Sequence, residues 1–167
     1  MFERMNRETR TVKWKGVLIF SLIFLFSGLV SWCLGGPPNN VLLFYIFPRC
    51  ALPIPVMYFL WFVSFAYLGF VFGGIFTSCE KFRKREAHKI LFFIFLSHII
   101  VLSTYPIFFK ALSPFVNFIV LLISIILALF AFLLSIKQYT IWTYCILLHI
   151  IWLVYNGYVS MAFAFIN

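Results

Sequence analysis

The sequence predicts an all-α integral membrane protein folded as a bundle of five transmembrane helices. Of its 167 residues, 65% are hydrophobic, 24 are Phe and only four are acidic, so a water-soluble globule could not bury its apolar surface. The uncharged apolar runs form five blocks, residues 16–34, 54–78, 90–109, 114–136 and 141–166. Each is close to the roughly 20 residues that a helix needs to cross about 30 Å of hydrocarbon. Continuous runs of this length, without the alternation of barrel strands, favour helices.

Residues 1–15 are expected to form a basic tail and residues 16–167 a single five-helix domain. The first apolar block is too long for the hydrophobic core of an ordinary signal peptide, and no small-x-small cleavage site follows it. We therefore interpret it as a transmembrane helix that stays in the mature protein. Eleven Lys and Arg lie in the tail, in segment 80–89 and at Lys137, whereas Arg49 and Lys110 lie on the other side. This asymmetry predicts a cytoplasmic N-terminus and an external C-terminus, in a bacterial plasma membrane.

The formal net charge of +9 raises the question of an acidic partner. Because the charge gathers beside apolar blocks, it favours contact of the tail and segment 80–89 with anionic lipid headgroups. Binding of nucleic acid through this segment is the less favoured alternative, and the prediction is no nucleic-acid partner. The four cysteines are scattered singly with no C-x-x-C, so the sequence encodes neither a metal knuckle nor a redox pair.

Ionisable chemistry inside the predicted membrane blocks is limited to histidine. No Asp or Glu lies in any of the five blocks. This removes the carboxylates that a proton-coupled transporter, an intramembrane aspartyl protease or a di-iron bundle would need, and it leaves a Ser/His/Asp triad without its acid. His98 and His149 are the only side chains there that titrate near neutral pH. The sequence therefore identifies no catalytic residues.

Polar side chains in the fifth block follow one helical stripe. His149, Trp152, Asn156 and Ser160 gather on a single face of a helix, with Asn167 on the same line. Polar groups inside a bilayer normally face other helices or a cavity, so this face is expected to point inward.

Aromatic side chains mark the start of the second block. Tyr58, Trp61 and Phe65 follow one side of the predicted helix, just after a proline-rich loop. They are typical of interfacial anchors, but three aligned rings would equally suit the wall of a flat apolar pocket. We expect Trp152 and Asn156 to line such a pocket on the opposite side.

Three further patterns leave alternatives open. His98 and Tyr105 share a face of the third helix. The histidine would form a hydrogen bond with a neighbouring helix, or it would contact a ligand. One such ligand is haem, with His98 and His149 as axial ligands. Gly69 and Gly73 form a G-x-x-x-G that serves internal packing or a dimer face. The fourth helix carries a stripe of small residues that favours close helix packing: Asn117, Ser124, Ala128, Ala131 and Ser135.

Taken together, these segments resemble the TspO/MBR family, the tryptophan-rich sensory proteins and the translocator protein. Trp61, Phe65 and Gly69 match W-x-x-x-[YF]-x-x-x-G, with Pro53 at the expected distance before them. The third helix ends in TYPIFF, similar to the family's W-x-P-x-F-F at Pro106, Phe108 and Phe109. The fifth helix matches the family at Trp152, Tyr155 and Asn167.

The resemblance implies a bundle that binds porphyrins, other tetrapyrroles or sterol-like molecules in an internal pocket under the first loop, as a sensor or transporter. It implies a homodimer, no required cofactor beyond porphyrin as a ligand, and photochemical porphyrin degradation at Trp61 and Trp152 as a family activity. The alternative is a structural or assembly subunit of a membrane complex that binds no ligand. The expected ligand-binding residues are Tyr58, Trp61, Phe65, His98, Tyr105, Trp152, Tyr155, Asn156 and Ser160.

Overall fold

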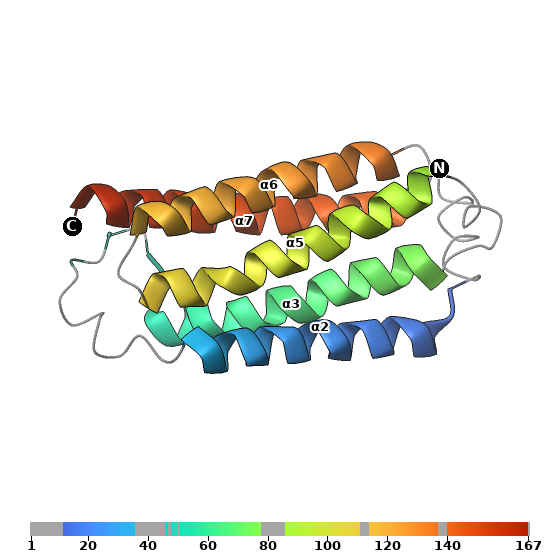
Figure 1. Ribbon diagram of the computed structural model, residues 1–167, viewed down its shortest axis with the longest axis horizontal. Helices are drawn as coiled ribbons and strands as arrows, with labels where there is room; N and C mark the ends of the chain where they lie inside the picture. The colour runs from blue at the N-terminus through green and yellow to red at the C-terminus, as the bar shows by residue number, and fades with distance from the viewer. Residues whose placement is uncertain are drawn as a thin grey trace.

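The computed structural model describes residues 12–35, 46, 48–49, 51–77, 86–110, 114–136 and 140–166. In these ranges the regular structure consists of five helices, α2 (Trp14–Gly35), α3 (Ile54–Thr77), α5 (Glu86–Lys110), α6 (Pro114–Ser135) and α7 (Thr140–Ile166) (Figure 1). All five are long and apolar enough to cross a membrane. The prediction of an all-α, five-helix integral membrane bundle is therefore confirmed.

The third helix differs most from its predicted limits, because α5 begins at Glu86 rather than at residue 90. An acidic side chain in the first turn interacts favourably with the helix dipole, and Glu86 also pairs with Lys89 at 2.9 Å. Near its other end, α5 continues through Pro106 to Lys110. Gly35 of α2 makes room for this proline, since a Cβ there would lie 2.7 Å from the Pro106 Cβ.

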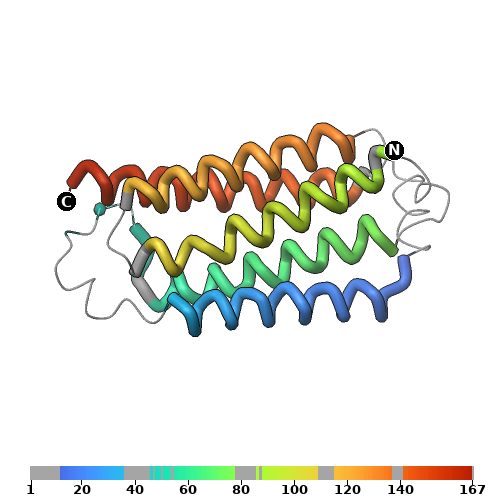
Figure 2. The backbone as a smooth tube through the Cα atoms, in the orientation of Figure 1, coloured from blue at the N-terminus to red at the C-terminus, as the bar shows by residue number. Residues whose placement is uncertain are grey.

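The helices form a closed ring in which each packs most extensively against two neighbours, in the order α2, α3, α7, α6, α5. In Figure 2, α5 runs obliquely across the bundle, so that its Lys110 end lies near α2 and α3. Hydrogen bonds near this end join α5 to α2: the Ser31 hydroxyl donates to the Ser103 carbonyl at 2.5 Å, and the Ser27 and Ser103 hydroxyls lie 3.2 Å apart. The Trp14 and Ile166 ends of the bundle are opposite, as five crossings require (Figure 1).

The G-x-x-x-G of α3 packs within the chain. A Cβ on Gly69 would lie 2.6 Å from the Phe20 carbonyl oxygen, and one on Gly73 would lie 2.7 Å from the Val17 Cα. The backbones of α2 and α3 therefore touch where α3 has no side chains. The alternative interpretation of these glycines as a dimer face is wrong, because α2 covers it.

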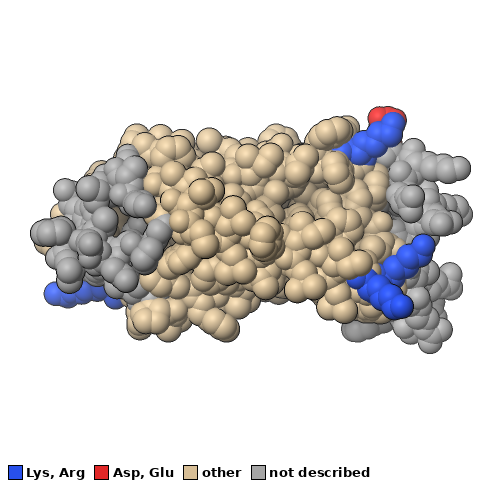
Figure 3. Space-filling model, turned by 60° about the horizontal axis from the view of Figure 1, so that its bottom comes forward, with Lys and Arg blue, Asp and Glu red and all other residues tan. Residues whose placement is uncertain are grey.

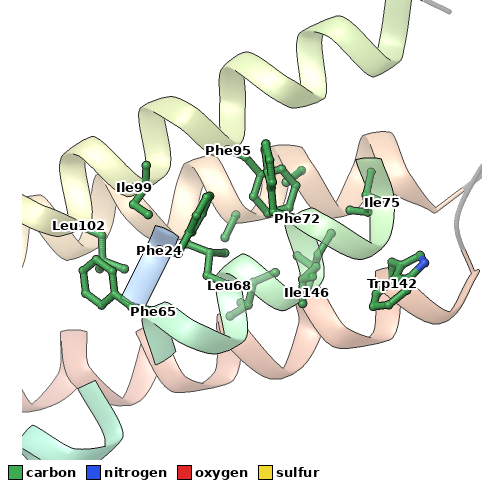
Figure 4. Close-up of a cluster of buried hydrophobic side chains, with 14 of the residues drawn as sticks. Phe24, Phe65, Leu68, Phe72, Ile75, Phe95, Ile99, Leu102, Trp142 and Ile146 are labelled. Carbon is green, nitrogen blue, oxygen red and sulfur yellow. The ribbon is translucent and has the colours of Figure 1, made fainter. Parts of the chain in front are cut away.

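An aromatic core fills the centre of the ring. Phe24 of α2, Phe65 and Phe72 of α3, and Phe95 of α5 converge there, with Trp142 of α7 toward one end (Figure 4). The small-residue stripe of α6 also faces inward, since all five of its members are buried, as its packing interpretation predicted.

The outer surface is that of a membrane protein. Large apolar side chains such as Leu22, Phe26 and Ile151 are more than half exposed. On the face in Figure 3, the described Lys and Arg side chains lie toward the two ends, with an uncharged band between them. Hydrocarbon is the solvent that such a band requires.

Candidate functional site

Trp61 is at the centre of an aromatic cluster near the Ile54 end of α3. Its ring lies 4.6 Å from that of Tyr105 on α5 and 5.6 Å from that of Phe65, measured between centroids. The Tyr105 hydroxyl is 3.2 Å from the Ser160 hydroxyl on α7. Four of the residues predicted from sequence, contributed by three helices, thus come together here.

Tyr58 is tied to α2 instead. Its ring packs edge-to-face on Trp32, with centroids 4.4 Å apart. Trp32 also contacts Phe62, at 5.6 Å. Sequence reasoning missed Trp32, because the first block is apolar on every side and no stripe singles the residue out. Its only signal was a tryptophan near the end of a predicted span.

The α7 members lie close to one another. The rings of Trp152 and Tyr155 stack with centroids 5.6 Å apart, and the Tyr155 hydroxyl accepts a hydrogen bond from the Leu52 amide at 3.0 Å. Asn156 is buried, and its amide nitrogen donates to the Trp152 carbonyl of its own helix at 2.7 Å. The polar stripe of α7 thus faces the inside of the bundle, and the Asn156 amide nitrogen bonds the backbone of its own helix.

Two contacts with α7, one from Leu52 just before α3 and one from α3 itself, set the depth of the tryptophans. One joins Leu52 to Tyr155, and in the other the Tyr67 hydroxyl donates to the Cys145 carbonyl at 3.0 Å. Trp61 and Trp152 both fall between these contacts, so they lie at a similar depth in the bundle. We call the group Tyr58, Trp61, Tyr105, Trp152 and Tyr155 the aromatic site.

Three hydrogen-bonding groups of the aromatic site are buried without a partner among the described residues: Tyr58 Oη, Trp61 Nε1 and Trp152 Nε1. An indole N–H can only donate, and a buried donor left unsatisfied costs about 1–3 kcal/mol. Residues 36–45, which contain the predicted pocket mouth under the first loop, lie outside the described residues, as does Asn167.

His98 belongs to a different cluster, deeper in the bundle. Its Nε2 lies 3.1 Å from the Nε2 of His149, within hydrogen-bonding distance, and both side chains are buried. An iron ligated axially by both rings would need these atoms roughly 4 Å apart, given metal–imidazole bonds of about 2.0 Å. The alternative of a histidine bonded to a neighbouring helix is the one observed.

A small cavity adjoins the histidine pair. Its volume is about 10 Å³, and its walls come from α3, α5, α6 and α7, including Leu68, Ala128, Ala131 and Ile146. A porphyrin would not fit there. Within the described ranges, no group of three or more His, Cys, Asp or Glu side chains is placed to hold a metal ion.

The fold and these clusters define a class: a five-helix integral membrane protein with an aromatic site toward one end and a histidine pair inside the bundle. Comparison with protein-family models finds no match to the chain, and a search of curated proteins finds no relative. The resemblance to the TspO/MBR family therefore stays a prediction based on motifs.

Proposed function

We propose that this protein is a divergent TspO/MBR-type membrane protein that binds a flat, largely apolar ring system in the aromatic site. Porphyrins and other tetrapyrroles are the preferred ligands, and sterol-like molecules the second choice. The protein would act as a sensor or transporter, without a required cofactor.

The observation that carries the proposal is the set of unpartnered donors on Tyr58, Trp61 and Trp152 among the described residues. Three such groups cost several kcal/mol in total if nothing accepts from them, at about 1–3 kcal/mol each. A ligand with carboxylate or carbonyl oxygens would offset this cost. The indole and phenol faces would meanwhile contact its apolar ring, a combination that suits ligands with a flat body and a polar edge.

The cellular setting follows from the charge pattern. We propose a bacterial plasma membrane, with the N-terminus cytoplasmic, the C-terminus external and the basic tail and segment 80–89 against anionic lipid. Most of that tail and segment lies outside the described residues. Lys13, Lys15 and Lys89 are described, and they lie at or near helix ends, where such contacts form. A homodimer is also proposed, through a surface other than Gly69 and Gly73.

Fluorescence titration with protoporphyrin tests the proposal. Trp61→Ala and Trp152→Ala should each weaken binding by roughly tenfold, since about 1.4 kcal/mol of lost contact suffices for that factor. Trp61→Phe keeps a ring but removes the N–H, so a smaller loss of about 1 kcal/mol is expected.

Trp14→Ala is the matched control, because Trp14 is 51% exposed and lies at the opposite end of the bundle. It should leave the affinity unchanged. Equal affinities for wild type and both aromatic-site alanine variants, with all proteins folded by thermal unfolding, would contradict the proposal.

One observation favours the alternative of a structural or assembly subunit. Much of the polar stripe already makes bonds between or along helices, including Tyr105 to Ser160 and His98 to His149. Groups used in this way hold a bundle together without any ligand. Under this alternative no porphyrin or sterol binds, and the same titration with wild-type protein distinguishes the two.

A further inference from the structure

Buried polar side chains continue along the seam between α5, α6 and α7, beyond the aromatic site. Toward the Trp14 end, the Thr143 hydroxyl donates to the Ser135 hydroxyl at 3.0 Å. In the middle lies the His98–His149 pair, and toward the other end Tyr105 meets Ser160. Thr143 and Ser160 are 17 residues apart on α7, about 26 Å along its axis. We call these three levels the polar seam, and it extends over most of the hydrocarbon thickness.

The intervals between the levels are also polar or hollow. Asn156 lies between His149 and Ser160, and Asn117 of α6 is 1% exposed with both amide atoms unpartnered among the described residues. On the other side, the cavity touches Ala131, one turn from Ser135, and Ile146, nearly one turn from Thr143. It therefore lies between the histidine pair and the Ser135–Thr143 level. About 10–15 Å³ accommodates one water molecule, so the cavity has room for about one.

The histidine pair has the geometry of a proton relay. An imidazole can accept a proton at one nitrogen and release one from the other, and intramembrane histidines with this property mark proton pathways. The Nδ1 atoms of His98 and His149 are both buried and have no hydrogen-bond partner in the described parts of the chain. Each ring thus joins its partner through Nε2 and keeps Nδ1 for exchange.

We propose that the polar seam conducts protons slowly across the membrane, with His98 and His149 as its exchange point. In the resting pair, His98 carries its proton on Nδ1, and the lone pair of His98 Nε2 accepts from Nε2–H of His149. A proton arriving at His149 Nδ1 displaces the Nε2 proton of that ring to His98, which then releases its Nδ1 proton to water that enters the seam. One proton enters and one leaves, and both rings end in the opposite tautomer. The rings must then separate and exchange their protons with water to return to the first state.

The same geometry sets the rate of proton transfer through the seam and its selectivity for protons over other ions. Adjacent levels of the seam are separated by roughly 9–16 Å along the helix axis, so a few water molecules must enter for each transfer. Hydrated ions do not fit a cavity of about 10 Å³. The walls of this cavity contain no titratable side chain other than the two histidines, so no buried carboxylate traps the proton. The seam does not depend on ligand binding at the aromatic site.

The test is proton flux into vesicles that contain the purified full chain and a trapped pH-sensitive dye. A potassium gradient with valinomycin supplies the driving force. Wild type should show flux above that of protein-free vesicles, and His98→Gln and His149→Gln should reduce it to the protein-free rate. Glutamine keeps a hydrogen-bonding group but cannot relay a proton between two nitrogens.

Two further variants separate the relay from general damage. Ser27→Ala removes a polar contact between α2 and α5 outside the seam, so it should keep wild-type flux. Thr143→Val, which removes a hydroxyl from the seam without touching the histidines, should slow it. Wild-type flux equal to that of empty vesicles, or unchanged flux in the histidine or Thr143 variants, would overturn the proposal.

Discussion

Substitution of Gly69 by Ala should destabilise the bundle by an amount that the α2–α3 contact sets. The new Cβ would lie 2.6 Å from the Phe20 carbonyl oxygen and 2.8 Å from the Ser21 Cα. Carbon atoms at an optimal contact are about 3.5–4.0 Å apart, so α2 must move by roughly 0.7 Å or more. The obstructing atoms belong to the backbone, so a side-chain rotation cannot relieve the contact.

Gly69→Ala has a destabilising effect, from overpacking, and a stabilising effect, from helix propensity, and their free energies can be compared. Overpacking of this kind costs about 1–3 kcal/mol, and we take the upper part of the range because the backbone must shift. Replacing a helical glycine by alanine returns about 1 kcal/mol through helix propensity. The net loss is about 2 kcal/mol, which corresponds to a fall of roughly 4–8 °C in the melting temperature of a chain of this size.

Gly157→Ala provides a matched control on α7. A Cβ there would meet only the Ile125 Cδ1, at an ordinary 3.6 Å, so the propensity gain remains and the melting temperature should hold or rise. Thermal unfolding in mild detergent, followed by the helical circular dichroism signal, measures both variants. A Gly69→Ala protein that melts at or above wild type would refute the close contact of α2 with α3.

Two further outcomes are expected. Tyr105→Phe removes the hydrogen bond to Ser160 and should cost only about 0.6 kcal/mol, the average for interhelical bonds in membranes, so a loss above about 2 kcal/mol in the same unfolding assay would contradict this. Reporters fused after Lys15 and after Asn167 should score cytoplasmic and external, respectively, and the reverse pattern would mean that the charge asymmetry does not set the orientation.

The fold could be predicted from the sequence because the bilayer imposes a length on each helix. Five apolar runs long enough to span it define five helices, whatever their neighbours are. The buried stripes of α6 and α7 could also be predicted, since helical periodicity shows which side chains of one helix share a face. Asn117 and Asn156 are buried for this reason.

Contacts between helices could not be predicted from the sequence, because helical periodicity does not show which face of one helix packs against which face of another. His98 and His149 were both expected to point inward, yet their 3.1 Å contact depends on the ring order that places α5 and α7 on either side of α6. The role of Gly69 required knowing that α2 is its neighbour. Trp32 escaped notice because a helix that is apolar all round gives no sign of which side faces the protein.

The position of α7 in the ring has a consequence for the synthesis and membrane insertion of the protein. Of the five described helices, α7 is synthesised after the other four; it supplies the partners of His98 and Tyr105 and closes the ring between α3 and α6. Until α7 is inserted, the polar side chains that it contacts on α5 lack these partners. A chain that stops short of α7 therefore leaves His98 and Tyr105 without these partners inside the membrane, where an unpaired polar group is costly.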